Sequence, residues 1–305
     1  MVREREVSSD AEQPLTMTDR SQLDADHSPS THRSFEAIAA GVVYDFGMNN
    51  GDDVDYYLQK GLRVVGVEAN PVLCSQCRRR FSDAIASSKL TILNVALVRE
   101  PSAELIEFFV HKSNHVLSQI GAPSDEIKND FESIRVPNRR ASDVIKEFGA
   151  PHYVKIDIEH FDHVVLAEML ENGIRPPYIS VESHSIQVFA LLVAAGYRSF
   201  NLIDGITVNG AYGNASINTP RGIESYSFKY HSAGPFGEDI ISPWLDQDSF
   251  FYFLASVGLG WKDIHATLTD VPVERYRPTP PPQPVPSLLQ RVNGRIRRAV
   301  ARSAA

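Results

Sequence analysis

Acidic residues and glycines alternate in one short stretch near the start of the chain, "YDFGMNNGDD". Asp45 precedes Gly47, Gly51 follows four residues later, and Asp52 and Asp53 come directly after it. A glycine lets the backbone approach a ligand closely because it has no Cβ. A dinucleotide pyrophosphate requires the spacing G-x-G-x-x-G, whereas this stretch reads D-x-G-x-x-x-G. The acids at both edges would repel phosphates, so we expect a ligand that carries positive charge.

A further acid follows the next apolar run, "RVVGV". Glu68 lies 21 positions after Gly47, and an acid at this distance typically accepts hydrogen bonds from the two hydroxyls of a ribose. The predicted ligand therefore has a ribose, no phosphates and positive charge. S-adenosyl-L-methionine fits this description, since it carries a sulfonium and an ammonium group. The alternative is that Asp45 caps a turn and Glu68 is a solvated strand end.

Charged residues also gather in "VKIDIEH", where Lys155, Asp157 and Glu159 are followed by His160. In an extended strand the first three would share one face. Charges on an otherwise apolar strand are costly to bury unless they are paired, so an ion pair of Lys155 with Asp157 or Glu159 is one interpretation. Asp157 is nearest the position that faces a cofactor, and we predict a functional role for it.

Two histidines are our candidates for a general base. Transfer of a methyl group to an alcohol requires removal of the hydroxyl proton, and a neutral imidazole has suitable basicity near pH 7. His160 follows "VKIDIE", and His184 follows Glu182 in "VESHSI". Asp157 and Glu182 are predicted to act beside them. A divalent metal held by these two carboxylates is an alternative that would acidify the hydroxyl.

These residues need a scaffold that brings several strand ends together. Apolar runs predict strands at residues 41–47, 63–70, 90–98, 104–112, 153–159, 178–183, 199–204 and 226–231. Between them, helices are predicted at residues 52–61, 71–85, 141–149, 162–173 and 185–196. Strands that alternate with helices favour an α/β fold with a mostly parallel sheet and helices on both faces. In such a sheet, ligands bind beyond the carboxyl ends of the strands.

The separated motifs "VVYDFGMNNG", "VVGVEANP", "LTILNVAL", "YVKIDIEHFDHVVL" and "YISVES" resemble the FkbM family of S-adenosylmethionine-dependent methyltransferases over residues 40–205. The resemblance implies a class I, Rossmann-like methyltransferase fold and O-methylation of a hydroxyl on a carbohydrate or natural product. It places Asp45, Gly47 and Gly51 at the methionine end of the cofactor and Glu68 at the ribose. The other cofactor contacts that we expect on this pattern are Asn49, Ala69, Asn94, Val95 and Ala96.

The chain departs from the family pattern after "KIDIE". The family has a glycine and then a small residue there, whereas this chain has His160 and Phe161. Two alternatives therefore stay open: a methyltransferase-like module that binds its ligand without catalysis, and a nicotinamide-dependent oxidoreductase. The glycine spacing and the acids of the first turn favour the methyltransferase.

Polar loops on either side of the motifs are predicted to complete the site. Residues 113–115 lie in an insertion that the resemblance places over the cofactor. Two segments rich in glycine and asparagine follow the last helix–strand repeat, and we expect them to bind a small-molecule or glycan acceptor. The sugar contacts predicted there are Tyr212, Asn214, Tyr226 and Trp244.

Composition bounds the rest of the chain. The 305 residues carry a net charge of −8, but residues 271–305 hold seven arginines and one glutamate, so the remainder carries −14. An acidic body argues against nucleic acid as a partner. The lone C-x-x-C of Cys74 and Cys77 lacks the second pair that a zinc site needs, and we predict no metal site from it.

The termini are predicted to lie outside the methyltransferase domain, residues 35–270. Residues 1–34 are polar and expected to be disordered, and residues 271–286 form a proline-rich linker. Residues 287–305 are a basic tail that could form an amphipathic helix on an anionic membrane. A solvated tail is the alternative. The chain has no signal-peptide pattern and no apolar run long enough to cross a membrane, so we expect a cytoplasmic protein, with any membrane association through the tail.

Overall fold

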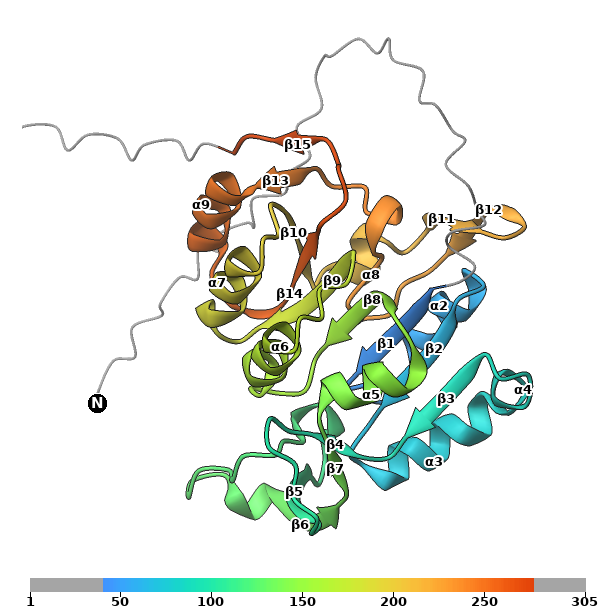
Figure 1. Cartoon of the computed structure of the whole chain (residues 1–305), viewed down its shortest axis with the longest axis vertical. Coiled ribbons are helices and arrows are strands. Elements are labelled where there is room, and N and C mark those ends of the chain that lie inside the picture. The colour runs from blue at the N-terminus through green and yellow to red at the C-terminus, as the bar shows by residue number, and fades with distance from the viewer. Residues whose placement is uncertain (1–40, 277–305) are drawn as a thin grey trace, which may run out of the picture. The chain divides into compact units, whose positions relative to one another are not determined.

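The computed structural model describes residues 41–276, and a central sheet of nine strands organises them (Figure 1). The strand order is β15-β13-β10-β14-β9-β8-β1-β2-β3. The strands are β1 (Val42–Phe46), β2 (Arg63–Val67), β3 (Leu90–Leu93), β8 (Pro151–Ile156), β9 (Tyr178–Ser183), β10 (Ser199–Asp204), β13 (Trp244–Asp246), β14 (Gly260–Thr267) and β15 (Val273–Glu274).

The half of the sheet that contains β1 is parallel. β1 pairs in parallel with β2 and β8, β2 with β3, and β8 with β9. β14 runs antiparallel between β9 and β10, and β13 runs antiparallel to β10. The predicted mostly parallel sheet is confirmed, and the carboxyl ends of β1, β2, β8 and β9 meet at one edge.

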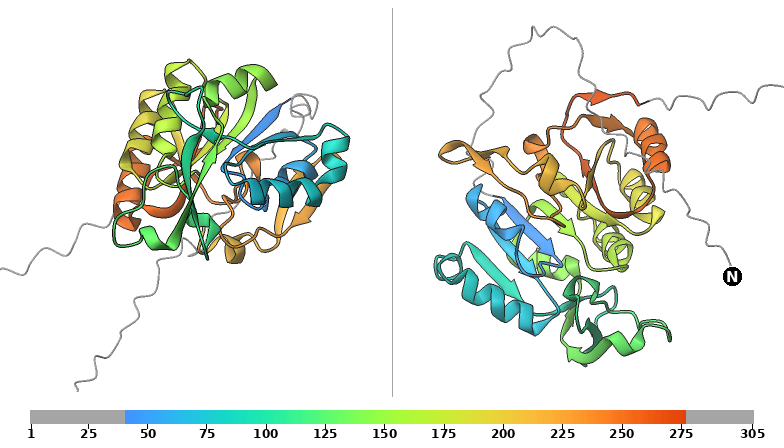
Figure 2. Two further views of the ribbon diagram at one scale, coloured as in Figure 1. Left: turned by 90° about the horizontal axis from the view of Figure 1, so that it is seen from below. Right: turned by 180° about the vertical axis from the view of Figure 1, so that it is seen from behind.

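Helices cover both faces of the sheet, as predicted (Figures 1 and 2). One buried cluster packs the sheet against α5 (Ala141–Phe148), α6 (Asp162–Glu171), α7 (Ile186–Ala194) and α9 (Gln247–Val257). The other cluster packs it against α2 (Val54–Gln59), α3 (Pro71–Arg80), α4 (Ser82–Ala86) and α8 (Val208–Ala211). Alternate residues of β1 serve the two clusters, since Tyr44 belongs to the first and Val43 to the second.

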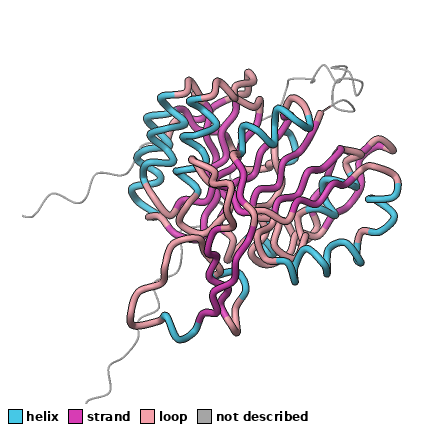
Figure 3. Tube along the Cα trace, turned by 60° about the horizontal axis from the view of Figure 1, so that its bottom comes forward, coloured by secondary structure: helices cyan, strands magenta, loops and turns pink. Residues whose placement is uncertain are grey.

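Short ribbons flank the main sheet. β5 (Ile106–His111) and β6 (Phe131–Val136) form an antiparallel pair that stands apart from it (Figure 3). The remaining elements are the pairs β4 (Ala96–Leu97) with β7 (Asn138–Arg139) and β11 (Ala215–Thr219) with β12 (Gly222–Tyr226), and the 3-10 turns η1 (His115–Leu117), η2 (Lys128–Asp130) and η3 (Gly237–Asp239).

Several predicted boundaries are wrong. The strand predicted at 90–98 breaks after Leu93, because the chain leaves the main sheet to form β4. The strand predicted at 153–159 ends at Ile156, and Glu159 and His160 adopt left-handed φ values of 51° and 66°. The period-two pattern therefore stops before Glu159. The strand predicted at 226–231 is not formed, whereas β14, which the sequence pattern did not indicate, sits inside the sheet.

The predicted termini lie largely outside the described residues. This applies to the N-terminal segment 1–34, to the basic tail 287–305 and to most of the predicted linker. At the start of that linker, β15 pairs with β13 and so belongs to the sheet. Within residues 41–276, none of the helices has the length and apolar character that a membrane crossing needs.

Candidate active site

A cavity of about 320 Å³ lies at the edge of the sheet where the carboxyl ends of the parallel strands meet. One half, which we call the donor half, is lined by residues that follow β1, β2 and β3. The other, the acceptor half, is lined by residues from the ends of β8, β9, β10 and β14 and from the loop between β12 and η3. Of the predicted site residues, the cavity is lined by Gly47, Asn49, Glu68, Ala69, Val95, Ala96, Asp157 and Glu182, and by Asn114 and His115 of the predicted loop.

The turn after β1 brings the donor half close to β8. Gly47 has a φ of +85°, and a Cβ on it would lie 1.6 Å from the backbone oxygen of Asp157. Only glycine fits such a position, both for its conformation and for its close approach. Gly51 also has a positive φ of +77°, but a Cβ there would meet the Phe81 ring and the Cys77 sulfur. Gly51 thus seats the turn against α3 and does not line the cavity.

Glu68 is held in place by the backbone of two loops. Its Oε2 accepts a hydrogen bond from Asn49 N at 2.9 Å, and its Oε1 accepts one from Asn70 N at 2.7 Å. Burial raises the pKa of Glu68, and these two hydrogen bonds oppose the rise. The carboxylate has unused acceptor positions and faces the cavity without a cation at ion-pair distance among the described residues.

The wall next to Glu68 is apolar. Val95, Ala96, Leu97, Phe108 and Ile120 line it. Asn94 does not line the cavity; its Nδ2 donates to the carbonyl oxygens of Glu68 and Ala69 at 2.9 and 2.8 Å, so it fixes the loop that carries them. The insertion between β5 and β6 adds Asn114 and His115 to the lining.

Lys155 connects the two halves. Its Nζ lies 3.1 Å from Asp157 Oδ2, 3.5 Å from Asp45 Oδ1 and 3.6 Å from Asp53 Oδ2. Burial alone would lower the pKa of Lys155, but the three carboxylates hold it well above its ordinary value. Asp45 lies behind the cavity and is fully buried; burial raises its pKa to about 7, and Lys155 limits the rise. The predicted pair of Lys155 with Asp157 is thus present.

Four carboxylic acids line the acceptor half: Asp157, Glu159, Glu182 and Asp263. Glu182 and Asp263 face each other across β9 and β14, and Glu182 Oε2 and Asp263 Oδ1 have no aligned hydrogen-bond partner among the described residues. Burial and the neighbouring acids raise the pKa of both groups. The same causes raise the pKa of Glu159 to about 8.

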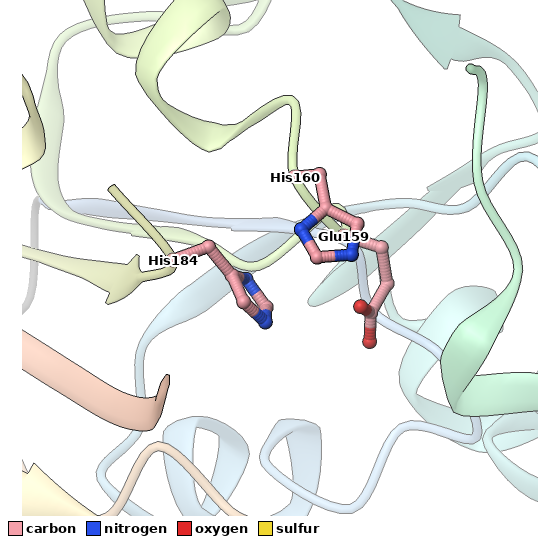
Figure 4. A group of neighbouring side chains, drawn as sticks. All are labelled: Glu159, His160 and His184. Carbon is pink, nitrogen blue, oxygen red and sulfur yellow. The ribbon is translucent and has the colours of Figure 1, made fainter. Parts of the chain in front are cut away.

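The two predicted histidines lie side by side, next to Glu159 (Figure 4). The ring centroids of His160 and His184 are 4.4 Å apart, and neither ring lines the cavity. His184 Nδ1 is 3.1 Å from Glu182 Oε2 and 3.7 Å from Asp162 Oδ2. Asp162 raises the pKa of His184, although burial opposes it.

A family comparison agrees with this arrangement. The sequence model of the methyltransferase FkbM domain matches residues 45–199, which is half of the chain. The chain belongs to the FkbM methyltransferase family. It is a class I methyltransferase whose methyl donor is S-adenosylmethionine, and this membership removes the nicotinamide-dependent alternative.

Solved structures give only distant similarities. An O-methyltransferase from Bacillus cereus in complex with SAH is 10% identical over 76% of each chain, with a TM-score of 0.34. The precorrin-6Y C5,15-methyltransferase from Geobacter metallireducens GS-15 is 11% identical over 61% of this chain and 74% of its own, with a TM-score of 0.31. Such matches are too weak to assign a substrate. Among curated proteins there was no significant match.

The donor half of this FkbM domain fits S-adenosylmethionine. Glu68 offers a buried carboxylate to hydroxyl donors, and the apolar wall around Ala96 suits a flat base. Lys155, the only lysine or arginine among the described lining residues, is already surrounded by three carboxylates. A pyrophosphate would find no free cation there, whereas a positively charged, phosphate-free nucleoside meets complementary charge.

The acceptor half contains residues that the sequence analysis missed: Gly205, Tyr230, His231, Ser232, Trp261 and Asp263. The predicted sugar contacts do not line the cavity. Tyr212 and Trp244 are buried in the core, and Tyr226 Oη donates to the backbone of Asp52. The sequence "GWKDIHAT" of β14 could have indicated two of these lining residues, because Trp261 and Asp263 are two positions apart and so share one face of the strand.

Proposed function

We propose that this FkbM methyltransferase transfers the methyl group to a hydroxyl of a carbohydrate or a polyhydroxylated natural product. The observation that carries the proposal is the acceptor half of the cavity. It combines four carboxylic acids with aromatic rings, and it offers no free lysine or arginine among the described lining residues.

The many carboxyl groups of this half, and the lack of a free lysine or arginine in its described lining, favour a neutral acceptor rich in hydroxyls. Asp157, Glu159, Glu182 and Asp263 supply oxygens that accept hydrogen bonds from hydroxyl groups. An acceptor with a carboxylate or phosphate would face these acids without a free lysine or arginine among the described lining residues to balance its charge. We therefore expect anionic acceptors to be poor substrates.

Aromatic rings give the acceptor half an apolar surface. Trp261 and Tyr230 line it together with His231, whose ring centroid lies 4.4 Å from that of Trp261 and 3.7 Å from that of Tyr230. Burial lowers the pKa of His231 and so favours its neutral form. Flat, uncharged rings beside hydroxyl-binding acids suit a sugar ring, which has C–H faces and hydroxyl edges.

Asp157 is the residue that we assign as proton acceptor. When bound, S-adenosylmethionine supplies an electrophilic methyl group on a sulfonium. An alcohol becomes a competent nucleophile when a positioned base takes its proton. Asp157 lines the cavity, its side chain is 30% exposed, and its oxygen Oδ2 is fixed by Lys155 at 3.1 Å. His184, which contacts Glu182, acts in this scheme as a positioning residue for that acid.

The test is transfer of an isotope-labelled methyl group to a panel of neutral glycans and polyols, with an anionic glycan for comparison. We expect an O-methyl ether on a neutral acceptor. Asp157→Asn should lower kcat by about 10²–10⁴-fold with the fold retained, whereas Asp125→Asn, at an acid whose side chain is 94% exposed, should not change it. Donor binding without transfer to any hydroxyl would instead support the non-catalytic module.

A further inference from the structure

Glu159, His160 and His184 form a compact group at the ends of β8 and β9. Each offers one ligand atom, and these atoms all lie within 4.8 Å of one another. Figure 4 shows the two imidazole rings near each other, with an angle of 54° between their planes, and the Glu159 carboxylate beside the His160 ring. Glu159 also lines the acceptor half of the cavity, so the group borders the site without being part of the donor pocket.

The backbone that presents Glu159 and His160 is unusual. Both residues adopt left-handed conformations, with φ values of 51° and 66°. A glycine would adopt them without strain, whereas side chains with a Cβ do so unfavourably. Two consecutive strained residues persist only where the surrounding structure holds them, and such residues cluster at functional sites. The turn brings both side chains close to His184, which directly follows β9.

Glu159 has no partner that would explain its burial. The residue is 9% exposed, yet no described residue donates a hydrogen bond to its carboxylate or lies at ion-pair distance from it. A buried carboxylate without a partner is unfavourable. On the other side of the group, His184 Nδ1 has no aligned hydrogen-bond partner among the described residues. The Glu159 carboxylate therefore has electron pairs free for a cation, and His184, whose Nδ1 lies against Glu182 and Asp162, has its second ring nitrogen left for the same ion.

We propose that Glu159, His160 and His184 form a binding site for a divalent transition-metal ion such as Mn²⁺, Co²⁺ or Zn²⁺. Two imidazoles and one carboxylate are a donor set that these ions prefer, whereas Mg²⁺ and Ca²⁺ prefer oxygen ligands alone. Three protein ligands leave coordination positions open, and Glu159 turns the site toward the acceptor half of the cavity. The proposed binding of this ion does not depend on the identity of the methyl acceptor.

Two overlapping groups of acids and His184 are less suitable. Asp157, Glu159 and Glu182 also lie close together, but Asp157 is already 3.1 Å from Lys155 Nζ. Asp162, Glu182 and His184 form the other group, and there Asp162 is 1% exposed and accepts a hydrogen bond from Ile158 N at 2.9 Å. His160 is exposed, which gives an ion a path into the proposed site.

The experiment is titration of the untagged, metal-stripped full chain with Zn²⁺ and Mn²⁺ by calorimetry, and with Co²⁺ by visible absorption, which reports nitrogen ligands. We expect saturable binding and Co²⁺ bands typical of nitrogen coordination. His160→Ala removes an exposed ligand and should weaken binding by at least about tenfold, while His163→Ala, a nearby histidine outside the group, should leave it unchanged. Glu159→Gln should weaken binding as His160→Ala does.

Three results would overturn the proposal. They are a wild-type chain without saturable binding, equal affinity of wild type and His160→Ala, and loss of binding in Glu182→Gln with full binding in His160→Ala. The last result would assign the ion to the acids instead. Thermal melts of each variant separate loss of a ligand from loss of the fold. Because no acceptor is present in the titration, its outcome is distinct from the test of O-methylation.

Discussion

Replacing Lys155 with methionine tests whether one buried cation holds the two halves of the site together. Lys155 is 5% exposed and lies within 3.6 Å of carboxylate oxygens of Asp45, Asp53 and Asp157. Removing one partner from a buried ionic group typically destabilises a protein by about 3–5 kcal/mol, because the remaining charges are left uncompensated. For a domain of this size, that loss corresponds to a fall in Tm of roughly 6–20 °C.

The loss should depend on pH in a defined direction. In the wild type, burial raises the pKa of Asp45 to about 7, and Lys155 limits the rise. Without Lys155 this pKa rises further, so the folded variant keeps a proton that the folded wild type loses between pH 6 and pH 8. The destabilisation is therefore largest at pH 8 and shrinks by about 1 kcal/mol at pH 6.

Urea unfolding of Lys155→Met and wild type at both pH values measures these quantities. Asp157→Asn is the matched control, because it leaves Lys155 with two carboxylates and removes a partly exposed partner; it should cost about 1 kcal/mol or less. An unchanged unfolding free energy in Lys155→Met, or a loss that grows on acidification, would refute the reasoning.

Two further substitutions test separate parts of the structure. Gly47→Ala should destabilise the fold by at least about 2 kcal/mol and weaken binding of the methyl donor, because the new Cβ would meet the Asp157 backbone. Gly173→Ala is the control, since Gly173 has a φ of +76° but open space around it, so its loss of stability measures the cost of the positive φ alone. Equal losses of unfolding free energy in the two variants would contradict the close approach at Gly47. Burial lowers the pKa of His265 to about 4, so on acidification this histidine is protonated in the unfolded chain before it is protonated in the folded chain. Its contribution to the free energy of unfolding is therefore fully present above about pH 6.5 and falls by about 3 kcal/mol towards pH 4. Urea unfolding across this range should show a steeper decline for wild type than for His265→Gln, and parallel curves would exclude the effect.

Much of the fold follows from local sequence pattern. β1, β2, β8 and β9 are short runs rich in apolar residues, as expected of buried parallel strands. The family motifs cover these elements, and the ends of these strands carry Gly47, Glu68, Asp157 and Glu182. For that reason the sequence predicted residues from both halves of the cavity.

The remaining parts depend on long-range pairing and on backbone conformation. Asp263 reaches the cavity only because β14 inserts between β9 and β10, and its mixed polar and apolar sequence gives no clear period. Asn94 and Gly51 were predicted as ligand contacts from their position in the chain. The Asn94 side chain instead donates to the loop that carries Glu68 and Ala69, and Gly51 packs against Cys77 of α3 and the Phe81 ring. The left-handed turn at Glu159 and His160 gives no signal in the residues of this chain, because glycine is absent from it; the one indication was the glycine that the family has in place of His160.

The central claim is that the acidic turn after β1 and Glu68 form a pocket for a positively charged, phosphate-free nucleoside. Calorimetric binding of S-adenosylmethionine, S-adenosylhomocysteine and NAD to wild type and Glu68→Gln tests it most directly. The account predicts that both methyl-donor forms bind and NAD does not, and that Glu68→Gln loses about 1.5–3 kcal/mol, or roughly 10- to 100-fold in affinity. Binding of NAD at comparable strength, or unchanged affinity in Glu68→Gln with an intact fold, would contradict it.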